Sequence, residues 1–271
     1  MPNVFGADPS LTSQRLTLLT SSRALVRAQV IDVTSSAFDH VIRSVTDFPA
    51  AVAGVITLTT GSWAIAAPIN LGTDQILIPA GTTVYMQSMG WDKVLTTTGD
   101  VLTVDGTLVA QGLALTGGNN GIVLHAGSEA FVTNCRIHAA GSCIRNNGCD
   151  QLSALGGYWT TDAGAGYGYR HSGNTAKGIL LANILAEDMG AFVHRASGTA
   201  SSVTISGCTT ISSTWGVNWP AASIPTQGML IVGSAFNSVA PLNGFTEASA
   251  RVNVKACLGS AGLLSETPIV P

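Results

Sequence analysis

The sequence predicts an all-β fold: a right-handed parallel β-helix of about eight coils, each of 22–27 residues, with an irregular N-terminal arm. The first observation is a six-residue pattern, apolar–x–apolar–x–small–apolar, that recurs through the last two thirds of the chain, and a fixed period of this length is typical of solenoid proteins. The second is the alternation of Val, Ile and Leu with Thr and Ser in the repeats, as in strands. The third is Gly or Asn in the fifth position of most copies, which favours a corner there. The copies are Val84–Met89, Leu108–Leu113, Ala130–Cys135, Leu152–Gly157, Ile179–Ile184, Val203–Cys208, Met229–Ser234 and Val252–Cys257.

Each coil is also expected to hold a second short strand about a dozen residues after the first. Two or three short strands per coil, stacked in parallel, describe a parallel β-helix, and the sequence leaves open which number applies. Parallel crossovers are nearly always right-handed, so we expect a right-handed rod. Helical repeats are excluded, because they would show a period of 3.6 rather than two. The second strands are expected at Val101–Val104, Ile122–His125, Cys143–Asn146, Tyr167–Arg170, Phe192–Arg195 and Trp215–Asn218.

The five cysteines are expected to be buried packing residues. Cys135, Cys208 and Cys257 occupy the sixth position of their copies, where Leu113 and Ile184 stand in others. A position shared by Cys, Leu and Ile points inward, because free Cys behaves as a small hydrophobic residue. The number of cysteines is odd and no CxxC motif is present, which favours buried thiols over disulfides or zinc ligands. No metal and no cofactor are therefore expected, and free thiols fit synthesis in a reducing cytosol.

Two regions are expected along the chain. Residues 1–45 lack the repeat and carry Arg15, Arg23 and Arg27, so we interpret them as an N-terminal arm or attachment segment. Residues 46–271 form the β-helix domain, and its first part, Gly54–Ile78, is predicted to cap the open N-terminal end. A cap is needed there because a terminal coil exposes unpaired backbone groups.

The composition indicates a rod whose sides are covered by other chains. Of the 271 residues, 46% are hydrophobic and only 10% are charged, so the lateral surfaces consist largely of Ala, Gly, Thr and Ser. Such surfaces are typical of subunits that pack against neighbouring copies. The net charge of −3 excludes a basic nucleic-acid-binding surface. The sequence shows neither a signal peptide nor an apolar run that could span a membrane, so we expect neither secretion nor a membrane partner.

The segment Ser44–Gly72, followed by Gln75–Met86, resembles the opening of a family of β-helical bacteriophage virion proteins. That family has a DLP–GVITL turn, then a Y-x-I–I-D-L-G strand and a TxIxG coil. Trp63 stands near the place of the usual Tyr, and Tyr85-Met86 replace the final Gly turn. The resemblance covers about forty residues, and it implies a structural protein of the virion that assembles as a homotrimer of rods around a common axis. The matching residues are Asp47-Phe48-Pro49, Gly54–Leu58, Ile65, Ile69–Gly72 and Thr82–Val84.

The alternative to a structural role is a tail spike or receptor-binding protein that binds or cleaves bacterial surface glycan, and cleavage needs two nearby carboxylates. Asp105, Glu129 and Asp150 each fall just before the first strand of their copies, so they are candidates for one corner of the rod. We favour a solvated edge that deters strand pairing. Glu187 and Asp188 are neighbours and are expected to point to opposite faces of a strand. We therefore assign no catalytic residue and expect no enzyme activity.

Arg145, Arg170 and Arg195 follow one another at intervals of 25 residues and are expected to stack on one corner of the rod. Stacked like charges repel unless something negative faces them. A contact with a neighbouring subunit or capsid protein and a plain solvated corner are equally favoured, and binding of an anionic glycan is less favoured. Trp159 and Tyr167 lie around a Gly-rich insertion, and for them we favour a subunit or capsid contact over core packing or glycan stacking.

The sequence therefore predicts a phage virion structural protein, either a capsid decoration (cement) protein or a head spike, homotrimeric and without catalysis. Its partner would be the major capsid protein or another virion protein, and assembly would take place in the host cytoplasm. The residues expected at its interfaces are Arg15, Arg23, Arg27, Arg145, Arg170, Arg195, Trp159 and Tyr167.

Overall fold

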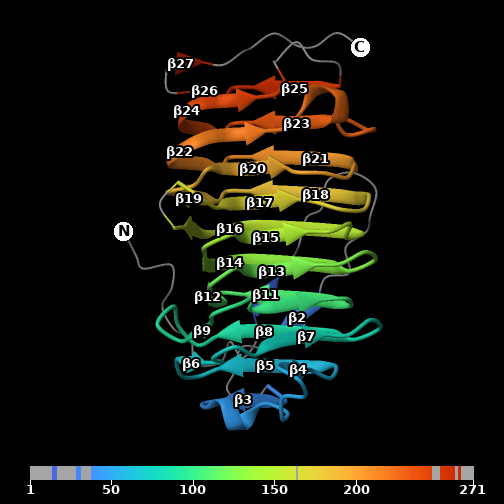
Figure 1. The fold of residues 1–271 in the computed structure, drawn as a ribbon, viewed down its shortest axis with the longest axis vertical. Coiled ribbons are helices and arrows are strands. Elements are labelled where there is room, and N and C mark those ends of the chain that lie inside the picture. The colour runs from blue at the N-terminus through green and yellow to red at the C-terminus, as the bar shows by residue number, and fades with distance from the viewer. Residues whose placement is uncertain are drawn as a thin grey trace.

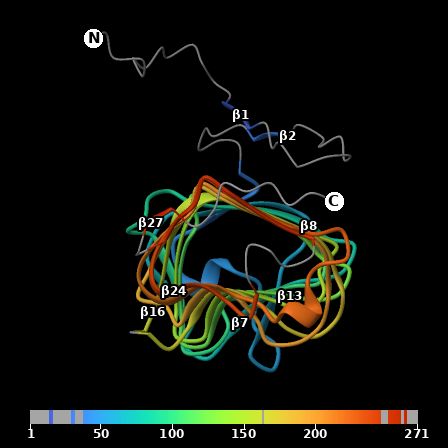
Figure 2. The same cartoon turned by 90° about the horizontal axis from the view of Figure 1, so that it is seen from above.

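The structure of the protein is a computed structural model that describes residues 14–16, 29–31, 38–162, 164–245, 251–259 and 262–263. It is an all-β parallel β-solenoid of about nine turns, which confirms the predicted fold class. Figure 1 shows the turns stacked along one axis, and Figure 2 shows them from above, where successive coils lie over one another. A regular coil contributes one strand to each of three parallel sheets, so the coils are three-stranded.

We number the sheets 1, 2 and 3 in the order in which a coil passes through them, and sheet 1 contains the second strands predicted from the sequence. Sheet 1 consists of β4 (Val55–Thr57), β7 (Gln75–Ile78), β10 (Leu102–Val104), β13 (Asn120–Leu124), β15 (Ser142–Asn146), β17 (Tyr167–His171), β20 (Ala191–Arg195) and the ends of β22 (Thr209–Asn218) and β24 (Ala235–Asn243). Sheet 2 consists of β3 (His40–Ile42), β5 (Gly61–Ile65), β8 (Thr83–Ser88), β11 (Thr107–Gln111), the first halves of β14 (Glu129–Ala139) and β16 (Gln151–Thr161), β18 (Ala176–Ala182), β21 (Ala200–Ser206), β23 (Met229–Val232) and β25 (Val252–Lys255). Sheet 3 consists of β6 (Ile69–Asn70), β9 (Val94–Thr97), β12 (Ala114–Gly117), the second halves of β14 and β16, β19 (Leu185–Glu187), the starts of β22 and β24, and β26 (Leu258–Gly259).

Five short elements complete the fold. Strand β1 (Gln14–Leu16) pairs antiparallel with β2 (Gln29–Ile31), and β27 (Gly262–Leu263) pairs antiparallel with β26. The 3-10 helices η1 (Val45–Asp47) and η2 (Ala221–Ser223) lie in connections. Of the arginines assigned to the arm, Arg15 belongs to β1, whereas Arg23 and Arg27 lie outside the described residues.

One residue in the left-handed conformation makes the corner between sheets 2 and 3. From the second copy of the repeat onwards this is the fifth residue, with φ between +50° and +69°, so the predicted corner is confirmed. Glycine adopts this conformation without strain, and asparagine tolerates it better than most residues. The corner residues are Gly112, Asn134, Gly156, Asn183, Gly207, Gly233 and Ala256.

Apolar side chains at alternate strand positions point inward and fill the space between the three sheets. All five cysteines are free and fully buried among them, which confirms the packing role predicted from the sixth position. Burial raises the pKa of the Cys135 and Cys149 thiols to about 12. These thiols therefore stay protonated at neutral pH and act as hydrophobic side chains.

The segment Gly54–Ile78, predicted to cap the N-terminal end, lies at that end and forms a regular coil. Strands β4, β5 and β6 pair in parallel with β7, β8 and β9, so Gly54–Ile78 belongs to regular coils. This extra coil brings the count to about nine turns rather than eight. The end is covered by the segment that precedes it, where the rings of His40 and Phe48 stack on Trp63 with centroid distances of 3.8 Å and 6.1 Å.

Replacing Gly156 with Ala is expected to destabilise the protein more than replacing Gly112 with Ala. Both residues have positive φ, so each substitution costs about 1–2 kcal/mol of unfolding free energy for placing a Cβ in the left-handed region. A Cβ on Gly156 would lie 2.3 Å from Oδ1 of Asn134 in the preceding coil, whereas a Cβ on Gly112 meets nothing within 4 Å. Urea unfolding followed by circular dichroism measures both losses.

The double variant Asn134→Gly with Gly156→Ala is the control, because it removes the side chain that the new Cβ would meet. It should bring the loss down to that of Gly112→Ala. Equal losses in the two single variants would contradict direct stacking of the corner residues.

Candidate functional site

The outward side chains of sheet 2 form a surface that is almost free of charge. Side chains alternate along a strand, so outward residues in register on successive strands make columns that run along the rod. Between β8 and β23, the regularly alternating outward positions of this sheet hold one charged residue, Glu129. These positions are Thr83, Tyr85, Gln87, Thr107, Val109, Gln111, Glu129, Phe131, Thr133, Gln151, Ser153, Leu155, Leu180, Ala182, Ser202, Thr204, Ser206, Leu230 and Val232. The exposed Lys177 at the start of β18 adds a second charge, which is paired with Asp150.

The middle column of sheet 2 carries large apolar side chains. In order along the rod it contains Tyr85, Val109, Phe131, Ser153, Leu180, Thr204 and Leu230. Phe131 and Leu180 are half-buried, and Leu230 is 36% exposed. Ser153 and Thr204 interrupt the column, and Val109 is buried, so Tyr85, Phe131, Leu180 and Leu230 supply its exposed apolar area. Soluble monomers rarely leave large apolar areas open to water. The composition predicts a lateral surface that is poor in charge, but it does not single out these residues. They could have been recognised because they stand between the inward positions of the repeat.

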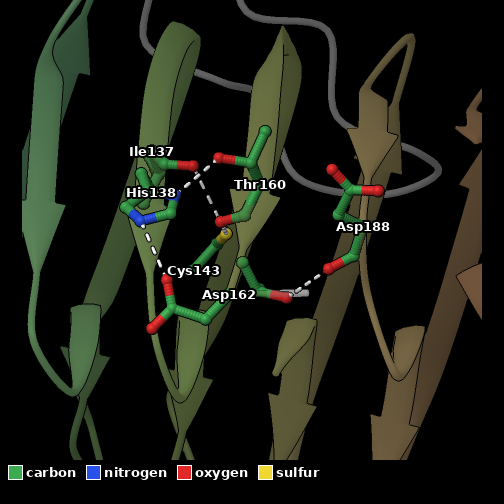
Figure 3. Close-up of polar contacts among 7 residues, drawn as sticks. Ile137, His138, Cys143, Thr160, Asp162 and Asp188 are labelled. Atoms are coloured by element: carbon green, nitrogen blue, oxygen red, sulfur yellow. Dashed lines mark hydrogen bonds and ion pairs between the residues drawn. The ribbon is translucent and has the colours of Figure 1, made fainter. Parts of the chain in front are cut away.

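Sheet 3 carries a polar network at its outer surface (Figure 3). Nδ1 of His138 forms a hydrogen bond of 2.8 Å with Oγ1 of Thr160, and Nε2 lies 3.3 Å from Oδ1 of Asp162. These residue types also occur in nucleophilic triads. However, the side chains of His138 and Asp162 are 40% and 63% exposed, so water screens their interaction. The network holds the turn at Asp162 against strand β14.

Further hydrogen bonds lie beside this network. Sγ of Cys143 donates weakly to the carbonyl oxygens of Ile137 at 3.5 Å and Thr160 at 3.3 Å. Burial raises the pKa of this thiol well above its ordinary value, which disfavours the thiolate that a nucleophile requires. Tyr158 donates a hydrogen bond to Glu187, and this bond raises the pKa of Tyr158.

The acidic residues considered for a glycosidase pair do not share a column. Asp105 lies 2.5 Å from Nδ1 of His125, and Asp150 lies 2.6 Å from Nζ of Lys177. Glu129 lies within strand β14, in register with a residue of β11 and one of β16, whereas Asp105 and Asp150 precede those strands. This arrangement supports the interpretation of these residues as a solvated edge.

The predicted stack of three arginines is wrong in its third member. Arg145 and Arg170 are aligned on β15 and β17, but β20 places His194 next in that column. Arg195 is aligned with His171 instead, because the step from Arg170 to its partner is one residue shorter than the expected interval. Nε and Nη2 of Arg195 donate to the carbonyl oxygen of Gly198 at 2.9 Å and 2.6 Å.

Tyr167, expected at an interface, lies half-buried on sheet 1 beside Arg170 and His194. Its ring stacks on that of His194 with centroids 4.3 Å apart, and the guanidinium carbon of Arg170 lies 5.4 Å from its centroid. The Tyr167 ring therefore contacts Arg170 and His194 of the same chain.

Trp159 is buried in the core, so its assignment to an interface is wrong. The residue is fully buried at an inward position of β16, between Ile137 and Ala186 in register, and its ring lies 6.2 Å from that of Phe192. The position of Trp159 beside a Gly-rich insertion suggests a loop. In the structure the first strand runs on through the corner as far as Thr161 and carries Trp159 into the core.

A second polar cluster is buried where sheet 1 ends. Nδ2 of Asn146 donates to Oη of Tyr169 at 3.0 Å, and Nδ1 of His171 lies 3.4 Å from the same Oη. The His171 ring stacks on Trp219 with centroids 5.8 Å apart. Burial, together with the charge of Arg195, lowers the pKa of His171 to about 4, so this residue is neutral in the folded protein at pH 7.

The free energy of unfolding is expected to fall as the pH decreases from about 6.5 towards 4. In this range the unfolded chain binds a proton at His171, whose ordinary pKa is 6.5, and the folded chain does not. The slope contributed by this residue is at most about 1.4 kcal/mol per pH unit. Urea unfolding at several pH values measures it. The variant His171→Asn should flatten the dependence, and an unchanged slope would contradict the assignment.

Comparison with known proteins identifies no relative, so the fold is what can be stated about this protein's class. Among the described residues, no group of three or more His, Cys, Asp or Glu side chains is arranged to hold a metal ion. The described part of the chain also contains no helix long and apolar enough to cross a membrane. No protein-family model matches the chain, and no significant similarity to a curated protein or to a solved structure was found. The protein is a β-solenoid of about nine turns for which no family is identified.

Proposed function

We propose that the protein is a structural component of a bacteriophage-type virion, a homotrimeric rod in which sheet 2 of each copy faces the common axis. The observation that carries this proposal is the outer surface of sheet 2 between β8 and β23, which has few charges and carries apolar side chains in its middle column. Burying such a surface between copies removes apolar area from water without burying charges, which is the favourable case for association.

The size of sheet 2 fits an interface between copies. Nine turns at about 4.8 Å are roughly 40 Å long, and five strand residues at about 3.3 Å are roughly 17 Å wide. The resulting area of roughly 700 Å² per copy is close to the ~800 Å² per partner of a standard protein interface. Sheets 1 and 3, which carry more charged side chains, would remain on the outside of the trimer.

In the virion the rod would serve as a capsid decoration (cement) protein or a head spike, assembled in the host cytoplasm and without catalysis. The resemblance of residues 44–86 to β-helical virion proteins supports this role. The arm with Arg15, Arg23 and Arg27 would contact the major capsid protein or another virion protein. Repetition over many sites makes modest affinity per site sufficient, because the contacts act together.

The variant Leu180→Glu is expected to dissociate the trimer, whereas Leu185→Glu is not. Both leucines are half-buried and point outward in the same coil, but Leu180 lies on sheet 2 and Leu185 on sheet 3. A buried, unpaired carboxylate at the interface costs several kcal/mol per copy, enough to dissociate a trimer at micromolar concentration. Light scattering coupled to size exclusion measures the mass, and circular dichroism checks the fold of both variants. Equal masses for the two folded variants would place the interface elsewhere.

The copy number of the chain in purified virions tests the role in the particle. A decoration protein should be present in hundreds of copies, because it repeats over the capsid lattice. Densitometry of a denaturing gel, with the major capsid protein as the internal standard, gives the ratio. A handful of copies per particle would contradict decoration and favour the tail spike that binds or cleaves glycan.

A further inference from the structure

Two charged residues border sheet 2 without an ion-pair partner among the described residues. Glu129 is the first residue of β14 and lies half-buried at the edge towards sheet 1. Arg136 lies on the same strand, beyond the corner at Asn134, and is exposed at the adjoining edge of sheet 3. Neither takes part in an ion pair within the described part of the chain. The ion pairs there are Lys93–Asp92, His125–Asp105, His138–Asp162 and Lys177–Asp150.

In the neighbouring coils, the same two edge positions carry no charge. The column of Glu129 contains Thr83, Thr107, Gln151, Gly178 and Ser202. The column of Arg136 contains Val94, Ala114, Tyr158, Leu185, Thr209 and Ala235. From β8 to β21, one coil therefore has a charge at each of these two edge positions, and the two charges are opposite. Lys177, which precedes Gly178 on β18, is already paired with Asp150 within the chain.

Rotational symmetry brings these two edges together at equal height. When copies surround an axis parallel to the rod, rotation does not shift one copy along that axis. The edge of sheet 2 near Glu129 in one copy then faces the edge near Arg136 in the next copy. Three sheets roughly 17 Å wide, arranged as a triangle, each lie about 5 Å from the axis, which is half of the ~10 Å spacing between packed sheets.

The geometry points to a ring of three ion pairs between subunits, in which Glu129 of one copy contacts Arg136 of the next and thereby fixes the axial register of the trimer. This inference rests on the proposed trimer with sheet 2 at its axis. A shift by one coil, or an antiparallel copy, would leave both charges against uncharged residues, and a partly buried charge without a partner is unfavourable. The apolar column then supplies affinity, and the charge pair selects one alignment among several that bury similar area.

Charge reversal tests the inference. In Arg136→Glu two carboxylates face each other at every contact, and in Glu129→Arg two guanidinium groups do. Each single variant should raise the concentration at which half of the chains are trimeric by on the order of 100-fold in 50 mM salt, and by less in 500 mM salt, where charges are screened. The double variant Glu129→Arg with Arg136→Glu restores opposite charges and should return this concentration to within a few-fold of the wild-type value. Sedimentation equilibrium measures it, and circular dichroism confirms that each variant is folded.

The outcomes separate this inference from the proposed function. If the wild type is trimeric and the single variants associate as tightly as the wild type, the ion pair is refuted and the trimer stands. If the single variants are weakened but the double variant is not rescued, the two residues do not pair and the inference is overturned. If the wild-type chain is monomeric, the proposed trimer itself fails.

Discussion

The structure depends on the stacking of equivalent backbone positions in successive coils. Neighbouring strands of a parallel sheet lie about 4.8 Å apart and are joined by regular backbone hydrogen bonds, so a residue meets its counterpart one coil away. The corner residues between sheets 2 and 3 illustrate the constraint, because Oδ1 of Asn134 leaves no room for a Cβ at Gly156. When a coil is longer than its neighbours, its extra residues lie in a turn outside the sheets. Both the core and the surface are therefore built from columns of equivalent residues, which run along the rod from coil to coil.

Much of the fold follows from the sequence because this stacking repeats the same requirements every 22–27 residues. The alternation of apolar residues indicates the strands, the fifth position indicates the corner, and Cys in place of Leu or Ile indicates the core. The errors have two physical origins, a change in coil length and a strand that continues through a corner. A change of one residue in coil length moves a side chain to the neighbouring position and so to the other face of the sheet. Arg195 was therefore misplaced, and Trp159 lies inward because its strand continues through a corner that the sequence suggested would break it.

The candidate interface could be predicted only in part. The composition predicts a lateral surface poor in charge, but it does not tell which of three sheets carries it. To assign it, the register between successive coils must be known. Phe131 and Leu180 lie in one column because of the register of the strands between them, and this register depends on the length of each coil. Some charged residues away from sheet 2 find partners within the chain, as His138 does with Asp162. Glu129 and Arg136, at the edges of sheet 2, have no such partner among the described residues.

The central claim is that sheet 2 is covered by other copies of the same chain. The measurement that tests it most directly is the mass of the wild-type protein in solution at micromolar concentration, by sedimentation equilibrium. The account predicts a particle of three chains, each of 27.6 kDa, with no detectable population of free single chains. A stable particle with the mass of one chain would contradict it, because the apolar column of sheet 2 would then be exposed to water.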